Sequence, residues 1–170
     1  MNADNFAKRA DAPATVEIAG AVERPGTLSA ADLAAIDTAG QIDVGQLDSK
    51  RRGTAVRLAA LLSHVGVQPA ARYLTLHASA DDFHASVPLD AVRDAAWLIY
   101  ALDGGPLPVA AGGPIRFWIP DTAACRTEEV DECASVKFVD RIELSAARGF
   151  DNRPADEQAH AALHHREQSN

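Results

Sequence analysis

The stretch WLIYALDGGPLPVAAGGPIRFWIP, residues 97–120, decides the fold. Its opening, WLIYALDG, is almost continuously apolar, which predicts a strand buried on both faces. The following run GGPLPVAAGGP contains four glycines and three prolines, so we expect a structured loop there rather than a helix. IRFWI, residues 115–119, predicts a second strand. The stretch therefore encodes a strand, an ordered loop and a further strand.

Patterns on both sides of this stretch predict short strands interleaved with short helices. Apolar and polar residues alternate, as in strands, in TVEIAGAV (15–22), RYLTLHAS (72–79), FHASVPL (83–89) and KFVDRIEL (137–144), and QIDVGQL (41–47) is also expected to form a strand. Helical spacing is present in LSAADLAAI (28–36), with Ser29 as N-cap, in VRLAALLSHVGV (56–67), with Gly66 after the last turn, and in LDAVRDA (89–95). RPGT (24–27) is expected to be a turn. The long helices of parallel βαβ crossovers are missing, so we predict an α+β fold.

Length and charge limit the possible partners. The chain has 170 residues, 47% of them hydrophobic, and a formal net charge of −8. This acidity argues against nucleic acid or an anionic membrane as the main partner, because both need clustered positive charge. No apolar run has the length of a membrane span, and the first 20 residues contain no apolar region of a signal peptide. The compartment stays open: extracytoplasmic if a signal was removed, otherwise cytoplasmic. We expect a flexible tail at 1–13, one domain at 14–148 and a polar, His-rich tail at 149–170.

The motifs resemble, in their order, those of the oxidoreductase molybdopterin-binding domain, the fold of sulfite oxidase and its bacterial relatives. VPL (87–89), LDGGPLP (102–108), AGGPIRFWIP (111–120) and SVKFVDRIEL (135–144) follow one another as they do in that family. VEIAGAVERPGTLSAADLAAI (16–36) and TAVRLAALLSHVGV (54–67) match its first strand and an early helix. The resemblance covers about residues 14–145 and implies the mixed α+β sulfite oxidase fold.

The resemblance also implies a cofactor site from which residues are missing. Catalytic members bind molybdenum through a cysteine thiolate upstream of the second helix, near residues 43–46 here, where no cysteine is present. The pterin-anchoring loop corresponds to residues 131–134, and its aromatic residue, glycine and first lysine are replaced by Asp, Glu, Cys and Ala. Arg116, Ser135 and Lys137 keep family positions, which implies at most a weakened anion site.

Two functional hypotheses follow. The first is a non-catalytic binding or interaction module, without a cofactor, that recognises an unknown protein or a small anionic ligand. The second is a molybdopterin-dependent oxidoreductase with an unusual ligand set, in which Asp43 would bind the metal. The missing cysteine and the acidic loop at residues 125–133 favour the first hypothesis. Whether the chain is an enzyme stays open.

Cys125 and Cys133, the only cysteines, flank a loop that contains the acids Glu128, Glu129, Asp131 and Glu132. Because the intervening residues do not look like core and their carboxylates repel one another, we expect a disulfide that closes the loop. Free thiols, or metal and redox chemistry, are the alternatives. The neighbouring acids should raise the thiol pKa values, which would make both cysteines poor nucleophiles.

Three further groups have a functional and a structural interpretation. Lys50, Arg51 and Arg52 could bind an anion, but a solvated hairpin tip is the simpler interpretation. Glu157, His160 and His164 would share a face of a tail helix and could bind zinc or nickel, although a solvated or docked tail is favoured. His84 lies near the family's substrate-side hairpin, whereas His64 and His77 are expected to be ordinary, partly buried histidines.

Overall fold

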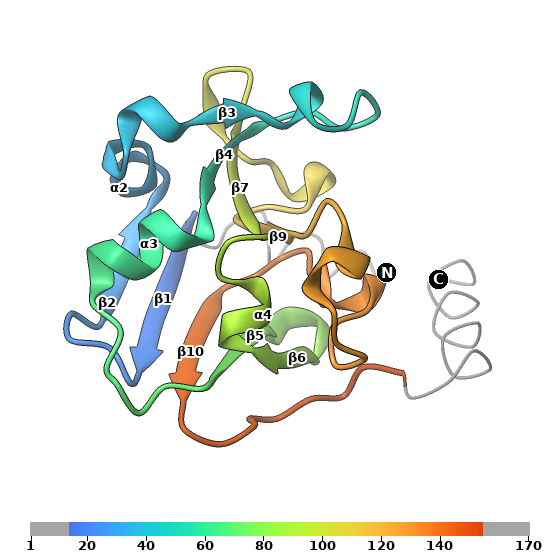
Figure 1. Ribbon diagram of the computed structural model, residues 1–170. Coiled ribbons are helices and arrows are strands. Elements are labelled where there is room, and N and C mark those ends of the chain that lie inside the picture. Colours follow the sequence, from blue (N-terminus) through green and yellow to red (C-terminus); the bar gives the residue numbers. More distant parts are fainter. Residues whose placement is uncertain (1–13, 155–170) are drawn as a thin grey trace.

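Two five-stranded sheets form the frame of the computed structural model, which describes residues 14–154 (Figure 1). The first sheet has the strand order β2-β1-β10-β5-β6, and all neighbours are antiparallel except the parallel pair β1 and β10. Its strands are β1 (Thr15–Gly20), β2 (Gly26–Ser29), β5 (Tyr73–Ala78), β6 (Phe83–Pro88) and β10 (Arg141–Ser145). The second sheet is antiparallel, with β4 and β9 on either side of β7. Its strands are β3 (Ile42–Asp43), β4 (Thr54–Arg57), β7 (Trp97–Leu102), β8 (Gly105–Pro106) and β9 (Arg116–Trp118).

Three short α-helices accompany the sheets between residues 14 and 154, so the predicted α+β class is confirmed. They are α2 (Ala30–Ala35), α3 (Leu58–Val65) and α4 (Leu89–Val92). The side chain of Ser29 accepts a hydrogen bond from the Asp32 amide, and Asp32 in turn accepts from the Ser29 amide, so Ser29 caps α2 as predicted. Helix α3 ends at Gly66, as predicted, and buries its apolar side chains. Helices α2 and α3 lie beside β1 and β2 (Figure 1).

The main core lies between the inner faces of both sheets and the helices. Strand β7 shows how the sequence builds it, because its side chains alternate between two clusters. Leu98 and Tyr100 join the main core, whereas Trp97 and Ile99 face the opposite side of the second sheet. There they form a smaller cluster with Trp118. Both faces of β7 are therefore buried, as its continuous apolar sequence predicted.

Three predicted elements differ from the structure, and one is the last strand, which begins only at Arg141 instead of at residue 137. The strand expected at 41–47 is reduced to Ile42–Asp43, because the Asp43 side chain accepts a hydrogen bond from the Gly45 amide and begins a 3₁₀ turn. The turn expected at 24–27 is partly strand, since Gly26–Ser29 pairs antiparallel with β1. None of the helices between residues 14 and 154 is long and apolar enough to cross a membrane.

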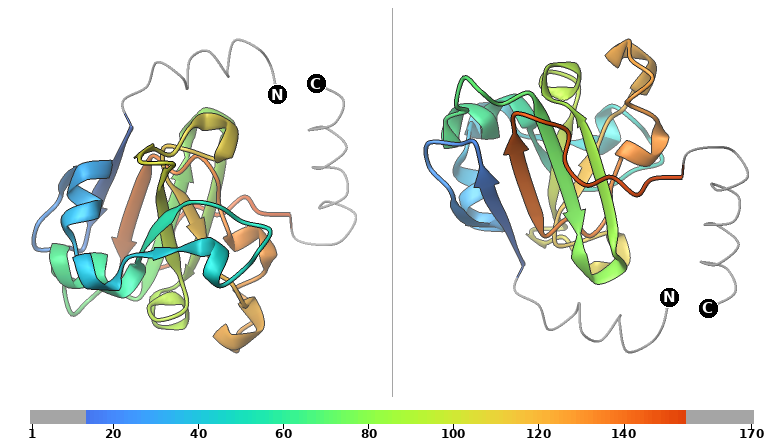
Figure 2. Two further views of the ribbon diagram at one scale, coloured as in Figure 1. Left: turned by 90° about the horizontal axis from the view of Figure 1, so that it is seen from above. Right: turned by 90° about the horizontal axis from the view of Figure 1, so that it is seen from below.

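The packed domain continues beyond the boundary expected at residue 148. The chain after β10 runs across the β5–β6 hairpin (Figure 2, right). Asn152 donates its amide hydrogen to the His84 carbonyl, and its side chain accepts a hydrogen bond from the His84 amide. We call residues 148–154 the C-terminal segment. Residues 1–13 and the group Glu157, His160 and His164, for which metal binding was the less favoured interpretation, lie outside the described residues.

Candidate functional site

Arg116 and Lys137, two of the predicted anion-site residues, lie together at the glycine-rich loop. Gly112 separates them: a β-carbon there would be 3.4 Å from Arg116 Cδ and 3.3 Å from Lys137 Cγ. Gly112 has a φ of +101° and accepts a hydrogen bond from the Phe138 amide, which fixes the loop against the segment that holds Lys137. The loop glycine thus allows two cationic side chains to approach the same point.

Arg51 is a third cation near Arg116 and Lys137. The simpler interpretation of its sequence, a solvated hairpin tip, did not predict this position. Arg116 and Trp118 alternate with Phe117 along β9 and therefore share one face of the second sheet. The Arg51 guanidinium carbon lies 5.1 Å from the centre of the Trp118 ring, in a cation–π contact. A solvated hairpin tip was expected here, but only its neighbours Lys50 and Arg52 are exposed. We call Arg51, Arg116 and Lys137 the cationic cluster.

The charge of Arg116 is not balanced within the described part of the chain. Its Nε atom is buried and has no hydrogen-bond partner among residues 14–154, and no carboxylate of these residues pairs with it. Burial, and then the positive charge of Arg51, lowers the pKa of Arg116. Arg51 itself is partly neutralised by Asp48, whose Oδ2 is 3.2 Å from Arg51 Nε. A partly buried guanidinium next to two further cations is a favourable place for an anion.

Ser135 has a different position from the other two predicted residues. Its hydroxyl accepts a hydrogen bond from the Ile119 amide, 3.1 Å away, just after β9. This contact joins the end of β9 to the chain that leads to Lys137. Ser135 therefore positions the chain that leads to Lys137 relative to β9.

The predicted disulfide between Cys125 and Cys133 is not formed. The prediction assumed that the intervening residues were not core, but Val130 is buried in the main core and anchors the loop. Arg153, from the C-terminal segment, donates hydrogen bonds to the Glu129 carbonyl and to Asp131. The loop is thus held by packing and by Arg153.

The two thiols are poorly suited to nucleophilic or metal chemistry. Burial raises the pKa of Cys125 and of Cys133, and the nearby Asp121 and Asp131, respectively, raise them further. The acids therefore have the direction of effect that the sequence predicted, although burial contributes more. No group of three or more potential metal-ligating side chains occurs among the residues that the structure describes.

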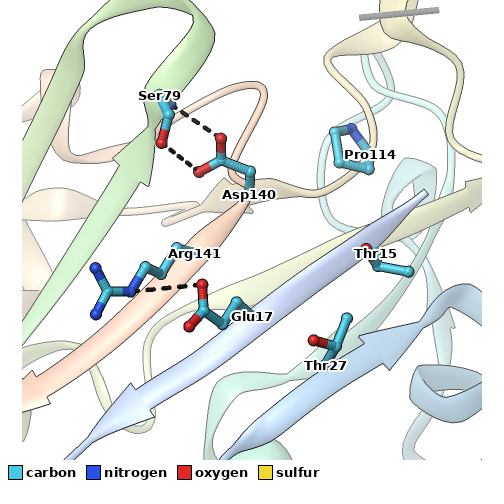
Figure 3. A pocket seen from close by; sticks show the side chains of 7 residues that line it. All are labelled: Thr15, Glu17, Thr27, Ser79, Pro114, Asp140 and Arg141. Carbon is cyan, nitrogen blue, oxygen red and sulfur yellow. Dashed lines mark hydrogen bonds and ion pairs between the residues drawn. The ribbon is translucent and has the colours of Figure 1, made fainter. Parts of the chain in front are cut away.

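A second candidate site is a pocket of about 390 Å³ on the first sheet (Figure 3). It is lined by Thr15, Glu17, Thr27, Ser79, Pro114, Asp140 and Arg141. Its charged groups are engaged with each other or with polar neighbours: Asp140 accepts hydrogen bonds from the Ser79 amide and hydroxyl. Arg141 Nε is also buried without a hydrogen-bond partner among the described residues, but it forms an ion pair with Glu17 at 3.7 Å. The pocket therefore offers a weaker attraction to a ligand than the unpaired Arg116.

The comparisons with known proteins identify the family and the fold of the chain. The chain matches the oxidoreductase molybdopterin binding domain over residues 7–152. The crystal structure of the sulfane dehydrogenase SoxCD from Paracoccus pantotrophus is similar, with a TM-score of 0.58 and 21% sequence identity over 82% of this chain and 39% of that chain. This chain thus spans well under half of that chain's length, and the likeness confirms the predicted sulfite oxidase-like fold. No curated protein sequence matches the chain. The chain belongs to the oxidoreductase molybdopterin-binding domain family.

Proposed function

We propose that this chain is a non-catalytic member of its family that binds a small anion at the cationic cluster. One observation carries the proposal: Arg116 is partly buried, its Nε is buried without a hydrogen-bond partner, and it has no anionic partner among the described residues. A partly buried charge is costly unless a ligand supplies the counter-charge. At a separation of ~5 Å and an effective dielectric constant of ~20, each cation attracts a unit negative charge by about 3 kcal/mol.

The acidic loop opposes this anion less than its four acids suggest, because two of their carboxylates have other partners. Asp131 pairs with Arg153 at 3.2 Å, and Glu129 accepts a hydrogen bond from the Tyr73 hydroxyl at 3.4 Å. The repulsion expected from the sequence between these acids and a bound phosphate is correspondingly reduced. Inorganic phosphate and pyrophosphate are suitable probes, since both offer oxygens to the guanidinium of Arg116.

The residues present fit only one part of a molybdopterin cofactor. The cationic cluster could hold its phosphate, and that is the chemistry the chain itself offers. The metal has no comparable set of ligands: Asp43 is exposed and its carboxylate caps the 3₁₀ turn, while Cys125 packs into the main core. This mismatch supports a binding module, and an oxidoreductase with Asp43 as a metal ligand is the alternative.

Calorimetric titration with phosphate and pyrophosphate tests anion binding. Arg116→Gln should weaken binding about tenfold to a hundredfold, which corresponds to roughly 1.4–2.8 kcal/mol. Arg52→Gln is the matched control, because Arg52 is exposed and pairs with Asp103 instead. It should leave the affinity within about twofold. Equal affinities for the wild type and Arg116→Gln would disprove the assignment.

The alternative is tested by cofactor content in a host that synthesises molybdopterin. We expect the purified protein to contain neither stoichiometric molybdenum by elemental analysis nor pterin fluorescence after acid oxidation. Stoichiometric molybdenum would restore the oxidoreductase hypothesis. In that case Asp43→Ala should release the metal if Asp43 is its ligand.

A further inference from the structure

His77 and His84 face each other across the β5–β6 hairpin, on the outer side of the first sheet. They are directly paired in the strand register, and their Nδ1 atoms are 2.8 Å apart. Both side chains are largely buried, with exposed fractions of 13% and 14%. This distance is that of a hydrogen bond, so one Nδ1 must carry a proton and the other must accept it.

The outer nitrogen of each ring faces a carboxylate. His77 Nε2 is 3.2 Å from Glu143 Oε2, and His84 Nε2 is 3.2 Å from Asp82 Oδ1. An ionised carboxylate can only accept hydrogen bonds, so both Nε2 atoms must carry protons.

The three contacts of the two rings require three protons, one more than two neutral rings carry. Two neutral imidazoles carry two protons in total, and the carboxylates require both of them on the Nε2 atoms. The Nδ1 atoms would then present two lone pairs to each other at 2.8 Å. A third proton between them satisfies all three contacts. We propose that the His77–His84 pair is a proton-binding site that holds three ring protons and thereby couples pH to docking of the C-terminal segment.

The two rings have different roles in this pair. Burial lowers the pKa of His77, an effect that its hydrogen bond to Glu143 opposes and the neighbouring charge of His84 reinforces. We assign the neutral state to His77, which donates through Nε2 to Glu143 and accepts at Nδ1. With three ring protons in the pair, His84 then donates through both nitrogens, to His77 and to Asp82.

The charges around the pair are mainly acidic, which favours the additional proton. Arg141 on β10 opposes it and lies 3.7 Å from the Glu143 carboxylate. Asp151 of the C-terminal segment is already neutralised by Arg148 and Arg153. Two acids contact the rings, Asp82 from the hairpin turn and Glu143 from β10, and the adjoining chain also contains Asp140 before β10 and Asp151 in the C-terminal segment.

His84 links the proton site to the C-terminal segment. Its backbone exchanges two hydrogen bonds with Asn152, of 2.7 and 3.0 Å, and the Phe150 ring lies 4.9 Å from the His84 ring. The Asn152 side chain also donates to the Asp82 carbonyl. If the third proton leaves, one of the three ring contacts must break, and a rotated His84 ring would disturb Phe150. Docking should therefore be strongest while the proton is bound and weaken as rising pH removes it.

Nuclear magnetic resonance of the full chain, labelled with ¹⁵N-histidine, tests the proton count. At pH 6 we expect three protonated nitrogens in the pair, with His77 as the neutral ring. Hydrogen exchange of the His84 and Ser86 amides, which bond to the C-terminal segment, reports docking. Corrected for intrinsic rates, their protection should fall about threefold to tenfold between pH 6 and 8.5. Two neutral rings at pH 6, unchanged protection, or a spectrum altered by EDTA, which would indicate a bound metal, would overturn the proposal.

Replacing either carboxylate by an amide should remove the need for the third proton. In Asp82→Asn the amide can donate to His84 Nε2, so a neutral His84 can donate from Nδ1 to His77. Asp82 is exposed and has a φ of +49°, a conformation that asparagine accepts. The fall in amide protection between pH 6 and 8.5 should therefore vanish in Asp82→Asn, as it should in Glu143→Gln. His64→Gln, on the exposed face of α3, should keep it. A fall that persists in both amide variants would refute the coupling.

Discussion

Arg153 shows how one residue can connect segments that are distant in the sequence. Its side chain is only 6% exposed, and it donates to the Ser86 carbonyl, to the Glu129 carbonyl and to the carboxylates of Asp131 and Asp151. The guanidinium thus has a partner on β6, on the acidic loop and within its own segment. A buried arginine is tolerated only with such partners, so Arg153 fixes the positions of all three.

Asp151 is the counter-ion of Arg153, and its replacement gives a prediction with a defined pH dependence. Burial alone would raise the pKa of Asp151, but hydrogen bonds from Arg153 and Arg148 outweigh it, so the pKa falls well below its ordinary value. A carboxylate with a lowered folded-state pKa stabilises the protein above the unfolded-state value, about 4, and this contribution is lost as pH falls. Asp151→Asn should cost about 3 kcal/mol at pH 7, measured by urea unfolding.

The difference between the wild type and Asp151→Asn should shrink as pH falls below about 4. Asp90→Asn is the control, since Asp90 is 92% exposed and its ion pair with Arg93 is long, at 3.9 Å. It should change the free energy of unfolding by less than about 0.5 kcal/mol. A difference for Asp151→Asn that is the same at pH 7 and pH 2 would contradict this account.

Residues were predictable from the sequence to very different degrees. Arg116 and Lys137 were predicted because they stand at fixed places in ordered motifs, and the structure brings them together at Gly112, while their binding of an anion stays a prediction. Arg51 and Arg153 could not be predicted, because their roles depend on which distant groups surround them. The polar sequence after residue 148 indicated a tail, and it gave no sign that Arg153 would find four acceptors.

At the scale of elements, predictions succeeded where the pattern was long and failed where one side chain changed the backbone. The continuous apolar run at Trp97–Leu102 and the alternating pair at Tyr73–Ala78 and Phe83–Pro88 form the predicted strands. Asp43 ends its strand early by capping a turn, a local competition that the alternating pattern does not reveal. The last strand begins only at Arg141, after irregular chain that includes Phe138 with a φ of +60°.

The acidic loop, residues 125–133, is an element held in place without a covalent link. Val130 is 5% exposed and packs in the main core, so Val130→Ala should cost about 1.5–3 kcal/mol from lost burial and the cavity it leaves. Glu128→Ala, at an exposed position of the same loop, should cost less than about 0.5 kcal/mol. Both values can be measured by chemical denaturation.

The same experiment distinguishes packing from a disulfide. Because Cys125 and Cys133 are not bonded to each other, the unfolding midpoint of the wild type should be the same with and without reductant. A midpoint lowered by reductant, together with a neutral Val130→Ala, would show that a disulfide closes the loop after all.

At the scale of the whole molecule, the C-terminal segment protects an edge of the first sheet. Strand β6 is the last strand of that sheet, and a free strand edge can pair with another chain. The outward-facing backbone groups of His84 and Ser86 are instead bonded to Asn152, Asp151 and Arg153. The segment therefore serves as a cover for the edge, in addition to joining β6 to the acidic loop.

This arrangement predicts self-association when the segment is removed. Two chains can be compared, one ending at Pro154 and one ending at Arg148, so that they differ only in residues 149–154. In the shorter chain Asp151 and Arg153 are lost together, so no buried charge is left unpaired and the core of both sheets should survive. Its exposed β6 edge should then form dimers or larger assemblies at micromolar concentration, visible by light scattering. The longer chain should form smaller assemblies at the same concentration. Assemblies of the same size for both chains would show that the edge is protected in some other way.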